Sequence, residues 1–459
     1  MRIHRELLEL SRTGDLSIAA SFKDEDIRRL RALIVGPPET PYEFGFYEFN
    51  VKIVRDYPTK PPTVTAITTN MGQTRFNPNI YSGGKVCLSI LGTWRGEKGE
   101  EWSSAQGLES VLISIQSLMS GNPYENEPGF ETVRSEEDKK NAQTYADKIR
   151  HESLRISVIE RMEGYLGLNH SRKETRLVTS PNSVDGAGGA GSESGSASGD
   201  DAGWETTPYS TDAPWEPHKD KCKLRFLWYY DSYHAAVDEG LKKHKDGTKF
   251  EKMPFEAPGN QMDGKYMYSD LKKRLTAIKK AMDADVKQWA KDGLSAVSRE
   301  LSIANNLKRQ REQAREFFGS NDIPVDIDPV DNNPFVWQLT LVGRNNTPLD
   351  GGIIKLRMHI SPRFPSELPR VKVETPLFHH RVSADGLLCY LFKQSEAGNL
   401  TTHVQSMIAA LEDANPAYDP RTRVNPEAER LLWGSEEEKK QYRRRLERSV
   451  QNSWECVSF

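Results

Sequence analysis

Two cysteines of this chain stand at the same distance from a polar triplet. Cys87 lies eight residues after the end of Asn77-Pro78-Asn79, and Cys389 lies eight residues after the end of His379-His380-Arg381. A cysteine thiolate is a nucleophile that can hold an acyl group as a thioester. The sequence neighbours of Cys87 are aliphatic, so no adjacent histidine is present to activate it as in a cysteine protease. The spacing favours acyl transfer over hydrolysis and indicates two copies of one design.

The segments around each cysteine also match. An apolar residue at every second position precedes each motif and predicts a strand with one buried face. Each strand leads into a proline-rich turn, at 56–62 and at 362–369, where pairing should end. Helical apolar spacing follows each cysteine and stops near Asn122-Pro123 and near Asn415-Pro416. The strand positions are Tyr47, Phe49, Val51 and Ile53 in the first copy and Ile354, Leu356, Met358 and Ile360 in the second.

This order of elements resembles the ubiquitin-conjugating (UBC) fold. The first segments that resemble it are the opening helix at 2–7, the turn at 36–42 and the proline loop at 57–62. Asn77-Pro78-Asn79 stands where the family usually has His-Pro-Asn, and Trp102-Ser103-Ser104-Ala105 stands where it has Trp-Ser-Pro-Ala. The resemblance implies an α+β fold with an N-terminal helix, a four-stranded antiparallel meander and C-terminal helices.

The first part of the chain resembles the Z-type branch of this family more closely. The runs at 110–119 and 122–131 carry that resemblance, and it resumes at 226–233 and 268–275. About the first 285 residues therefore resemble one such enzyme with a C-terminal extension, and a second, more divergent UBC-like domain follows. The expected divisions are a catalytic UBC domain at 1–166, a linker at 167–218, a helical extension at 219–299 and the second domain at 300–459.

The composition agrees with several domains and one disordered segment. Hydrophobic residues make up 36% of the 459 residues, below an average globular chain even when the glycines are added. The stretch from Ser180 to Gly203 is almost entirely small or polar, so it cannot offset the entropy that ordering it would cost. We therefore expect the linker to be disordered.

Several classes of protein are disfavoured by charge and composition. The net charge is -3, which argues against general nucleic-acid binding. No long apolar run or signal core is present, so a membrane role is not expected. The four cysteines, which are too few for a disulfide scaffold and lack metal-ligand spacing, are Cys87, Cys222, Cys389 and Cys456. A cytoplasmic or nuclear protein without a metal or organic cofactor is the expectation.

The resemblance implies roles for the residues of the first motif. Cys87 would carry the C-terminal carboxyl of ubiquitin as a thioester and pass it to a lysine. Asn79 is the candidate donor to the oxyanion that forms, although it could act by holding the loop. Asn77, in place of histidine, would support the turn. Glu125 or Glu127 could orient the incoming lysine, or simply belong to a solvated loop.

The second motif keeps a cysteine and a histidine but changes the asparagine. Arg381 stands where the first copy has Asn79, and a guanidinium could donate to an oxyanion or merely hold the loop. Cys389 is therefore either a second thioester site or a buried, vestigial thiol.

The expected partners follow from the family. They are ubiquitin or a ubiquitin-like modifier, the activating enzyme that uses ATP, a ubiquitin ligase and protein substrates. The activating enzyme should meet the first helix around Arg2 and Arg5. Two alternatives stay open: an enzyme specific for a ubiquitin-like modifier, and a non-catalytic scaffold that binds ubiquitin. A mixed version, with a catalytic first domain and a regulatory or binding second domain, accounts best for the difference between Asn79 and Arg381.

Overall fold

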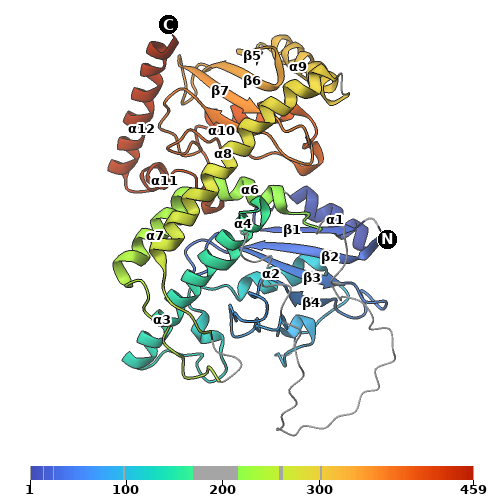
Figure 1. Cartoon of the computed structure of the whole chain (residues 1–459), viewed down its shortest axis with the longest axis vertical. Helices are drawn as coiled ribbons and strands as arrows, with labels where there is room; N and C mark the ends of the chain where they lie inside the picture. The colour runs from blue at the N-terminus through green and yellow to red at the C-terminus, as the bar shows by residue number, and fades with distance from the viewer. Residues whose placement is uncertain are drawn as a thin grey trace.

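Two four-stranded antiparallel sheets, each accompanied by helices, organise the chain (Figure 1). The computed structural model describes residues 2–13, 15–23, 25–96, 99–168, 215–257, 262–299 and 302–457. Most of the predicted linker, including 180–203, lies outside these residues. The strand orders are β1-β2-β3-β4 and β5-β6-β7-β8, with neighbours in sequence also neighbours in the sheet. The predicted α+β class and the two antiparallel meanders are confirmed.

The first unit begins with a helix and continues into its sheet and further helices. Its elements are α1 (Arg2–Thr13), β1 (Ile18–Lys23), β2 (Asp26–Val35), β3 (Phe46–Lys52), β4 (Thr63–Ala66), α2 (Leu108–Ser117) and α3 (Glu136–Glu152). After α3 the backbone continues as a π-helical segment, Ser153–Glu160, and as α4 (Arg161–Leu166).

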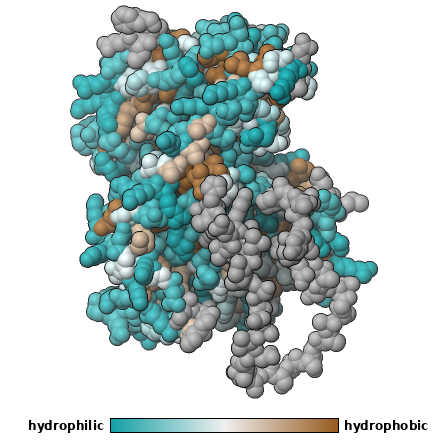
Figure 2. All heavy atoms as spheres, in the orientation of Figure 1, coloured by the Kyte–Doolittle hydropathy of each residue, from teal (hydrophilic) through white to brown (hydrophobic). Residues whose placement is uncertain are grey.

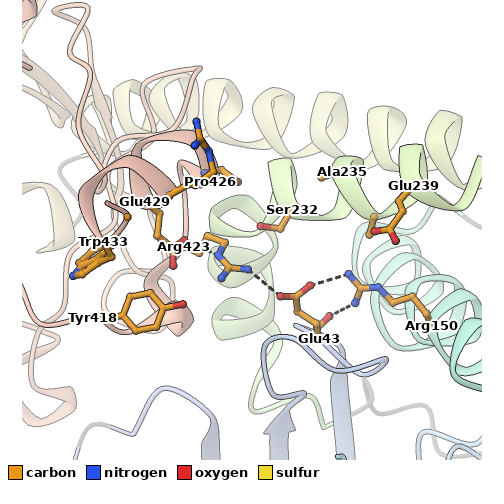
Figure 3. Close-up of a pocket in the computed structure, with 13 residues that line it drawn as sticks. Glu43, Arg150, Ser232, Ala235, Glu239, Tyr418, Arg423, Pro426, Glu429 and Trp433 are labelled. Atoms are coloured by element: carbon orange, nitrogen blue, oxygen red, sulfur yellow. Dashed lines mark hydrogen bonds and ion pairs between the residues drawn. The ribbon is translucent and has the colours of Figure 1, made fainter. Parts of the chain in front are cut away.

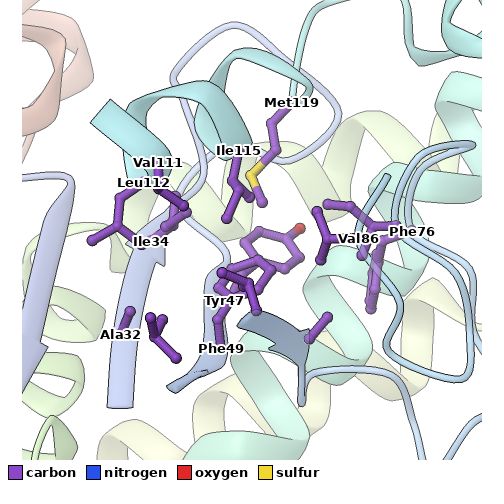
Figure 4. Close-up of a cluster of buried hydrophobic side chains, with 14 of the residues drawn as sticks. Ala32, Ile34, Tyr47, Phe49, Phe76, Val86, Val111, Leu112, Ile115 and Met119 are labelled. Atoms are coloured by element: carbon purple, nitrogen blue, oxygen red, sulfur yellow. The ribbon is translucent and has the colours of Figure 1, made fainter. Parts of the chain in front are cut away.

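One face of the first sheet packs against α2. Alternate residues of β2 and β3 point to this face, and the register pairs Ala32 with Phe49 and Ile34 with Tyr47. They meet Val111, Leu112 and Ile115 of α2 in one buried cluster (Figure 4). The strand face predicted from the alternating pattern is therefore the core face, and Val86, next to Cys87, belongs to the same cluster.

The other face of the same sheet is covered as well. Leu33, Val35, Phe44 and Phe46 are buried in a separate cluster formed with the π-helical segment, α4 and the helical extension. The extension consists of α6 (Lys219–Trp228), α7 (Tyr230–Lys243) and α8 (Tyr268–Ser298). The predicted helical character of this region is thus observed, and most of its aromatic residues are buried in this cluster. At the edge of the predicted linker, His218 is 2% exposed and lies against the backbone of β2.

The second unit repeats the plan of the first. Ile354, Leu356, Met358 and Ile360 lie in its core with Val404, Met407 and Leu411. Its elements are α9 (Ser302–Ser320), β5 (Val325–Val330), β6 (Asn333–Val342), β7 (Ile353–His359), β8 (Arg370–Val373), α10 (Leu400–Glu412), α11 (Pro426–Leu432) and α12 (Glu436–Gln451).

Helix α8 connects the two units (Figure 1). Leu271, Leu275 and Ile278 in its first half belong to the cluster on the outer face of the first sheet, whereas Ala296 near its end belongs to the second core. Gly293 lies so close to the ring of Phe335 that a Cβ atom would be 2.5 Å from it. The helix therefore packs directly on β6 of the second unit.

Polar contacts reinforce the junction between the units. The Tyr229 hydroxyl donates to the carbonyl of Arg421 at 2.7 Å, and Arg370 pairs with Asp220 of α6. Arg421 and Arg423 pair with Asp15 and Glu43 of the first unit at 3.3 Å and 3.1 Å. Figure 2 shows a largely hydrophilic face on which hydrophobic side chains surface at the waist between the units.

No helix among the described residues is long and apolar enough to span a bilayer.

A buried ion pair attaches the loop after α7 to α3 and generates a stability prediction. Lys148, 0% exposed, contacts the Glu256 carboxylate at 2.8 Å. Glu256→Ala should destabilise the protein by about 3 to 5 kcal/mol, because it leaves the buried Lys148 ammonium without its carboxylate partner. Urea unfolding measures this change. The double variant Lys148→Met, Glu256→Leu should lose clearly less stability than Glu256→Ala, and an equal or greater loss would contradict this account.

Candidate functional site

Cys87 lies in the loop between β4 and α2 and is fixed by two hydrogen bonds with Asn79. Its amide donates to the Asn79 carbonyl at 2.8 Å, and the Asn79 side-chain amide donates to the Cys87 carbonyl at 3.1 Å. Cys87 keeps 4% of its surface exposed. The Asn79 amide group has two hydrogens, so this contact leaves one of them for another acceptor. Asn79 therefore holds the loop beside the sulfur and can still act as a donor.

Asn77 is the buried support of this turn. It is 0% exposed, and its side-chain oxygen accepts from the Asn79 amide at 2.8 Å. Its side-chain nitrogen donates to the Leu118 carbonyl at 2.8 Å and to the Tyr42 hydroxyl at 3.1 Å. Tyr42 in turn donates to the Phe76 carbonyl at 2.7 Å. The geometry agrees with the predicted role of Asn77, and it adds Tyr42, which the motif does not reveal.

Arg75 braces the same turn from the other side. It is 6% exposed, donates to the Pro78 carbonyl, lies 4.8 Å from the centre of the Tyr81 ring and pairs with Glu127 at 3.0 Å. Glu127 follows α2, so this ion pair ties the segment after the helix to the motif. The carboxylate of Glu127 is therefore occupied by its ion pair with Arg75, whereas Glu125 is exposed.

The second motif reproduces the backbone pattern of the first. The Cys389 amide donates to the Arg381 carbonyl at 2.8 Å, and the Arg381 amide donates to Nδ1 of His379 at 3.0 Å. These contacts match the Cys87–Asn79 and Asn79–Asn77 pairs. The side chains differ, because the Arg381 guanidinium lies 3.8 Å from the Cys389 sulfur itself. Arg381 is therefore positioned as a partner of the thiol and does not brace the carbonyl of Cys389.

The surroundings of Cys389 differ more strongly from those of Cys87. Cys389 is 0% exposed and belongs to the hydrophobic cluster that contains Phe44 and Tyr229. Burial raises the pKa of Cys389, although Arg381 and Arg225 counteract part of this effect. The sulfur is thus enclosed at the junction between the second unit and the helical extension, where a neutral thiol is favoured.

The two histidines of the second motif are also buried. Burial lowers the pKa of His379 to about 3 and the pKa of His380 to about 2. Both imidazoles are therefore neutral near pH 7. His379 accepts the Arg381 amide, and His380 contacts the Tyr442 hydroxyl at 3.1 Å.

Two further cysteines, Cys222 and Cys456, lie outside the two motifs. Burial raises the pKa of Cys222 to about 12, and the side chain of Cys456 lies outside the described residues. Within the described ranges, no group of three or more His, Cys, Asp or Glu side chains could hold a metal ion.

Comparisons with known proteins agree with the duplicated plan. A family model for ubiquitin-conjugating enzyme matches the chain twice, over residues 2–153 and 303–450. Ubiquitin-conjugating enzyme E2 Z of Danio rerio is 36% identical over 282 residues, which cover 61% of this chain and 68% of that protein. The Xenopus tropicalis E2 Z is 49% identical over 164 residues, 36% of this chain and 50% of that protein. The chain thus spans half the length of the Xenopus relative.

A solved E2 domain of a ubiquitin-conjugating enzyme from Toxoplasma gondii is 27% identical. The match covers 34% of this chain and 97% of the solved Toxoplasma gondii chain, with a TM-score of 0.26.

The match of one family model to both units confirms the predicted pair of UBC-like domains, and the E2 Z relatives confirm the Z-type resemblance. This chain belongs to the ubiquitin-conjugating enzyme family.

Proposed function

We propose that the chain is a ubiquitin-conjugating enzyme with Cys87 as its thioester residue. The Cys87 thiolate attacks the thioester that joins ubiquitin to the activating enzyme, and the acyl group moves from one sulfur to the other. A lysine amine then attacks the carbonyl carbon. A C–N bond forms, the C–S bond breaks, the amine loses a proton and the Cys87 thiolate leaves.

The paired hydrogen bonds between Asn79 and Cys87 carry this proposal. They fix the backbone of Cys87 in the loop, and they keep the Asn79 side-chain amide at the backbone carbonyl of the residue that would carry the thioester. A positioned donor stabilises the oxyanion that forms when the amine attacks. Asn77, Tyr42 and Arg75 support this arrangement from the protein interior.

The second domain is proposed to be an accessory module and not a second thioester site. Cys389 has no exposed surface, and its environment favours the neutral thiol. The helical extension would have to separate from the second domain before a modifier could reach it. The difference between Asn79 and Arg381 agrees with the mixed version, in which only the first domain is catalytic.

The first helix is the proposed meeting place for the activating enzyme and ligases. Arg5 is exposed there, with 68% of its side chain accessible, and Leu8 is 40% exposed. Arg2 instead donates to the carbonyls of Ser104 and Gln106, so it joins the helix to the loop before α2. The first helix and the loop before α2 would then form one binding surface. Ubiquitin itself or a ubiquitin-like modifier is the proposed cargo, in the cytoplasm or nucleus.

Thioester charging tests the assignment of Cys87. The full chain, Cys87→Ala, Cys389→Ala and the buried control Cys222→Ala are incubated with activating enzyme, ATP and either ubiquitin or a ubiquitin-like modifier. On non-reducing gels, only Cys87→Ala should lose the thiol-sensitive adduct. An adduct that survives in Cys87→Ala would make Cys389 a second site. Absence of an adduct with every modifier would favour the scaffold alternative.

A second prediction concerns Asn79. Asn79→Asp keeps the size of the side chain but removes its donors, so discharge of the Cys87 thioester to free lysine should slow by about 100-fold. Single-turnover discharge measures this rate on chains that were charged beforehand. Asn79→Ala should behave similarly. Discharge at the normal rate in both variants would show that no donor at this position is needed.

A third prediction separates the two glutamates after α2. Glu127→Ala should lower the free energy of unfolding by about 2 kcal/mol, because the buried Arg75 guanidinium loses a charged partner. Glu125→Ala, two residues away on an exposed position, should change stability little and serves as the matched control. Urea unfolding distinguishes the two variants, and equal losses of stability would contradict the bracing role of the Arg75–Glu127 ion pair.

If Glu125 orients the lysine, its alanine variant should slow discharge of the thioester without affecting charging of Cys87.

A further inference from the structure

A cavity of about 820 Å³ opens where the first domain, the helical extension and the second domain meet (Figure 3). Its volume and its place between domains are typical of ligand sites. Glu43 and Arg150 line it from the first domain, Ser232 lines it from α7, and Glu429 of α11 lines it from the second domain. It is distinct from the loop that carries Cys87, so its occupant need not take part in thioester chemistry.

A row of alternating charges crosses this cavity and ends on an unpaired oxygen. Arg150 pairs with Glu43 at 3.0 Å, Glu43 pairs with Arg423 at 3.1 Å, and Arg423 pairs with Oε2 of Glu429 at 2.6 Å. Oε1 of Glu429 is itself buried and has no hydrogen-bond partner among the described residues, and Glu429 as a whole is 7% exposed. Arg430 also lines the cavity, but it pairs with Glu438, so the group that would continue the row beyond Glu429 is a further cation.

The surroundings of Glu429 suit a cation with an apolar stem. The rings of Tyr418 and Trp433 lie 5.3 Å apart and line the cavity next to Glu429, as Figure 3 shows. Aromatic faces attract ammonium and guanidinium groups and also cover methylene groups. Ser232 is 8% exposed, and its buried hydroxyl also lacks a partner among the described residues. Burial raises the pKa of Glu429, the negative charges of Glu43 and Glu39 add to this effect, and the contact with Arg423 counteracts it.

We propose that this cavity binds a lysine or arginine side chain of a partner protein, with its cation on Glu429 and its stem against Tyr418 and Trp433. The partner would be a substrate or ligase with an exposed basic segment. Because the cavity needs all three parts of the chain, this binding would also give the second domain a role that requires no thiol chemistry. The inference does not depend on the proposed activity at Cys87.

Binding of short peptides to the full chain tests the proposal. Labelled pentapeptides that differ only in a central lysine, arginine, norleucine or glutamate are titrated with the protein, and binding is followed by fluorescence anisotropy at low and high salt. The lysine or arginine peptide should bind saturably, and salt should weaken it. Glu429→Gln should reduce its affinity by at least about tenfold, since it removes the charge that receives the cation.

Two further variants keep the test decisive. Tyr418→Ala, at a residue that is 51% exposed, should reduce affinity by about threefold without affecting folding. Glu427→Gln changes an exposed carboxylate of the same helix, which pairs with Arg445, and should leave affinity unchanged. Equal binding of the norleucine peptide, binding of spermidine without either basic peptide, or no effect of both Glu429→Gln and Tyr418→Ala would overturn the proposal.

Discussion

The packing of the helical extension on the outer face of the first sheet is the contact on which the rest of the molecule depends. Phe44 stacks on Tyr229 with ring centres 3.9 Å apart, and Tyr233 donates to the Phe44 carbonyl at 2.8 Å. The same cluster continues to Leu387, Cys389 and Val424 of the second domain. One hydrophobic cluster therefore joins both domains and encloses Cys389. It also forms the junction between the domains, beside the cavity. Large aromatic side chains contribute most to such contacts.

The same cysteine motif occurs in both domains but in two different environments. The backbone hydrogen bonds around Cys87 and Cys389 correspond, so both motifs fold alike. Their environments separate them: Cys87 lies in a loop that keeps some exposure, whereas Cys389 lies inside the junction. In the second domain the motif has become part of an interface. Cys389, the neutral His379 and Arg381 take part in the packing and hydrogen bonds of this interface. The accessory role proposed for the second domain follows from this difference.

Much of this fold could be predicted from local sequence. Alternation at Tyr47 and Phe49 and at Leu356 and Met358 identified the core strands, and the Cys87 motif identified the loop, because these signals depend on near neighbours. Contacts across long separations could not be predicted. Arg75 and Glu127 pair across the turn, and nothing in the sequence joins them. Whether Cys389 was reactive or buried also stayed open, because residues far away in the chain, such as Tyr229, decide its exposure.

The relative reactivity of the cysteines in the native chain tests whether the second motif is enclosed while the first is accessible. Brief treatment with iodoacetamide, followed by mass spectrometry of the peptides, measures the alkylation rate at each position. We expect Cys87 to react in the native protein, whereas Cys389 and Cys222 should stay protected until denaturant separates the domains. Alkylation of Cys389 as fast as Cys87 under native conditions would contradict the enclosure of the second motif, and with it the accessory role of the second domain.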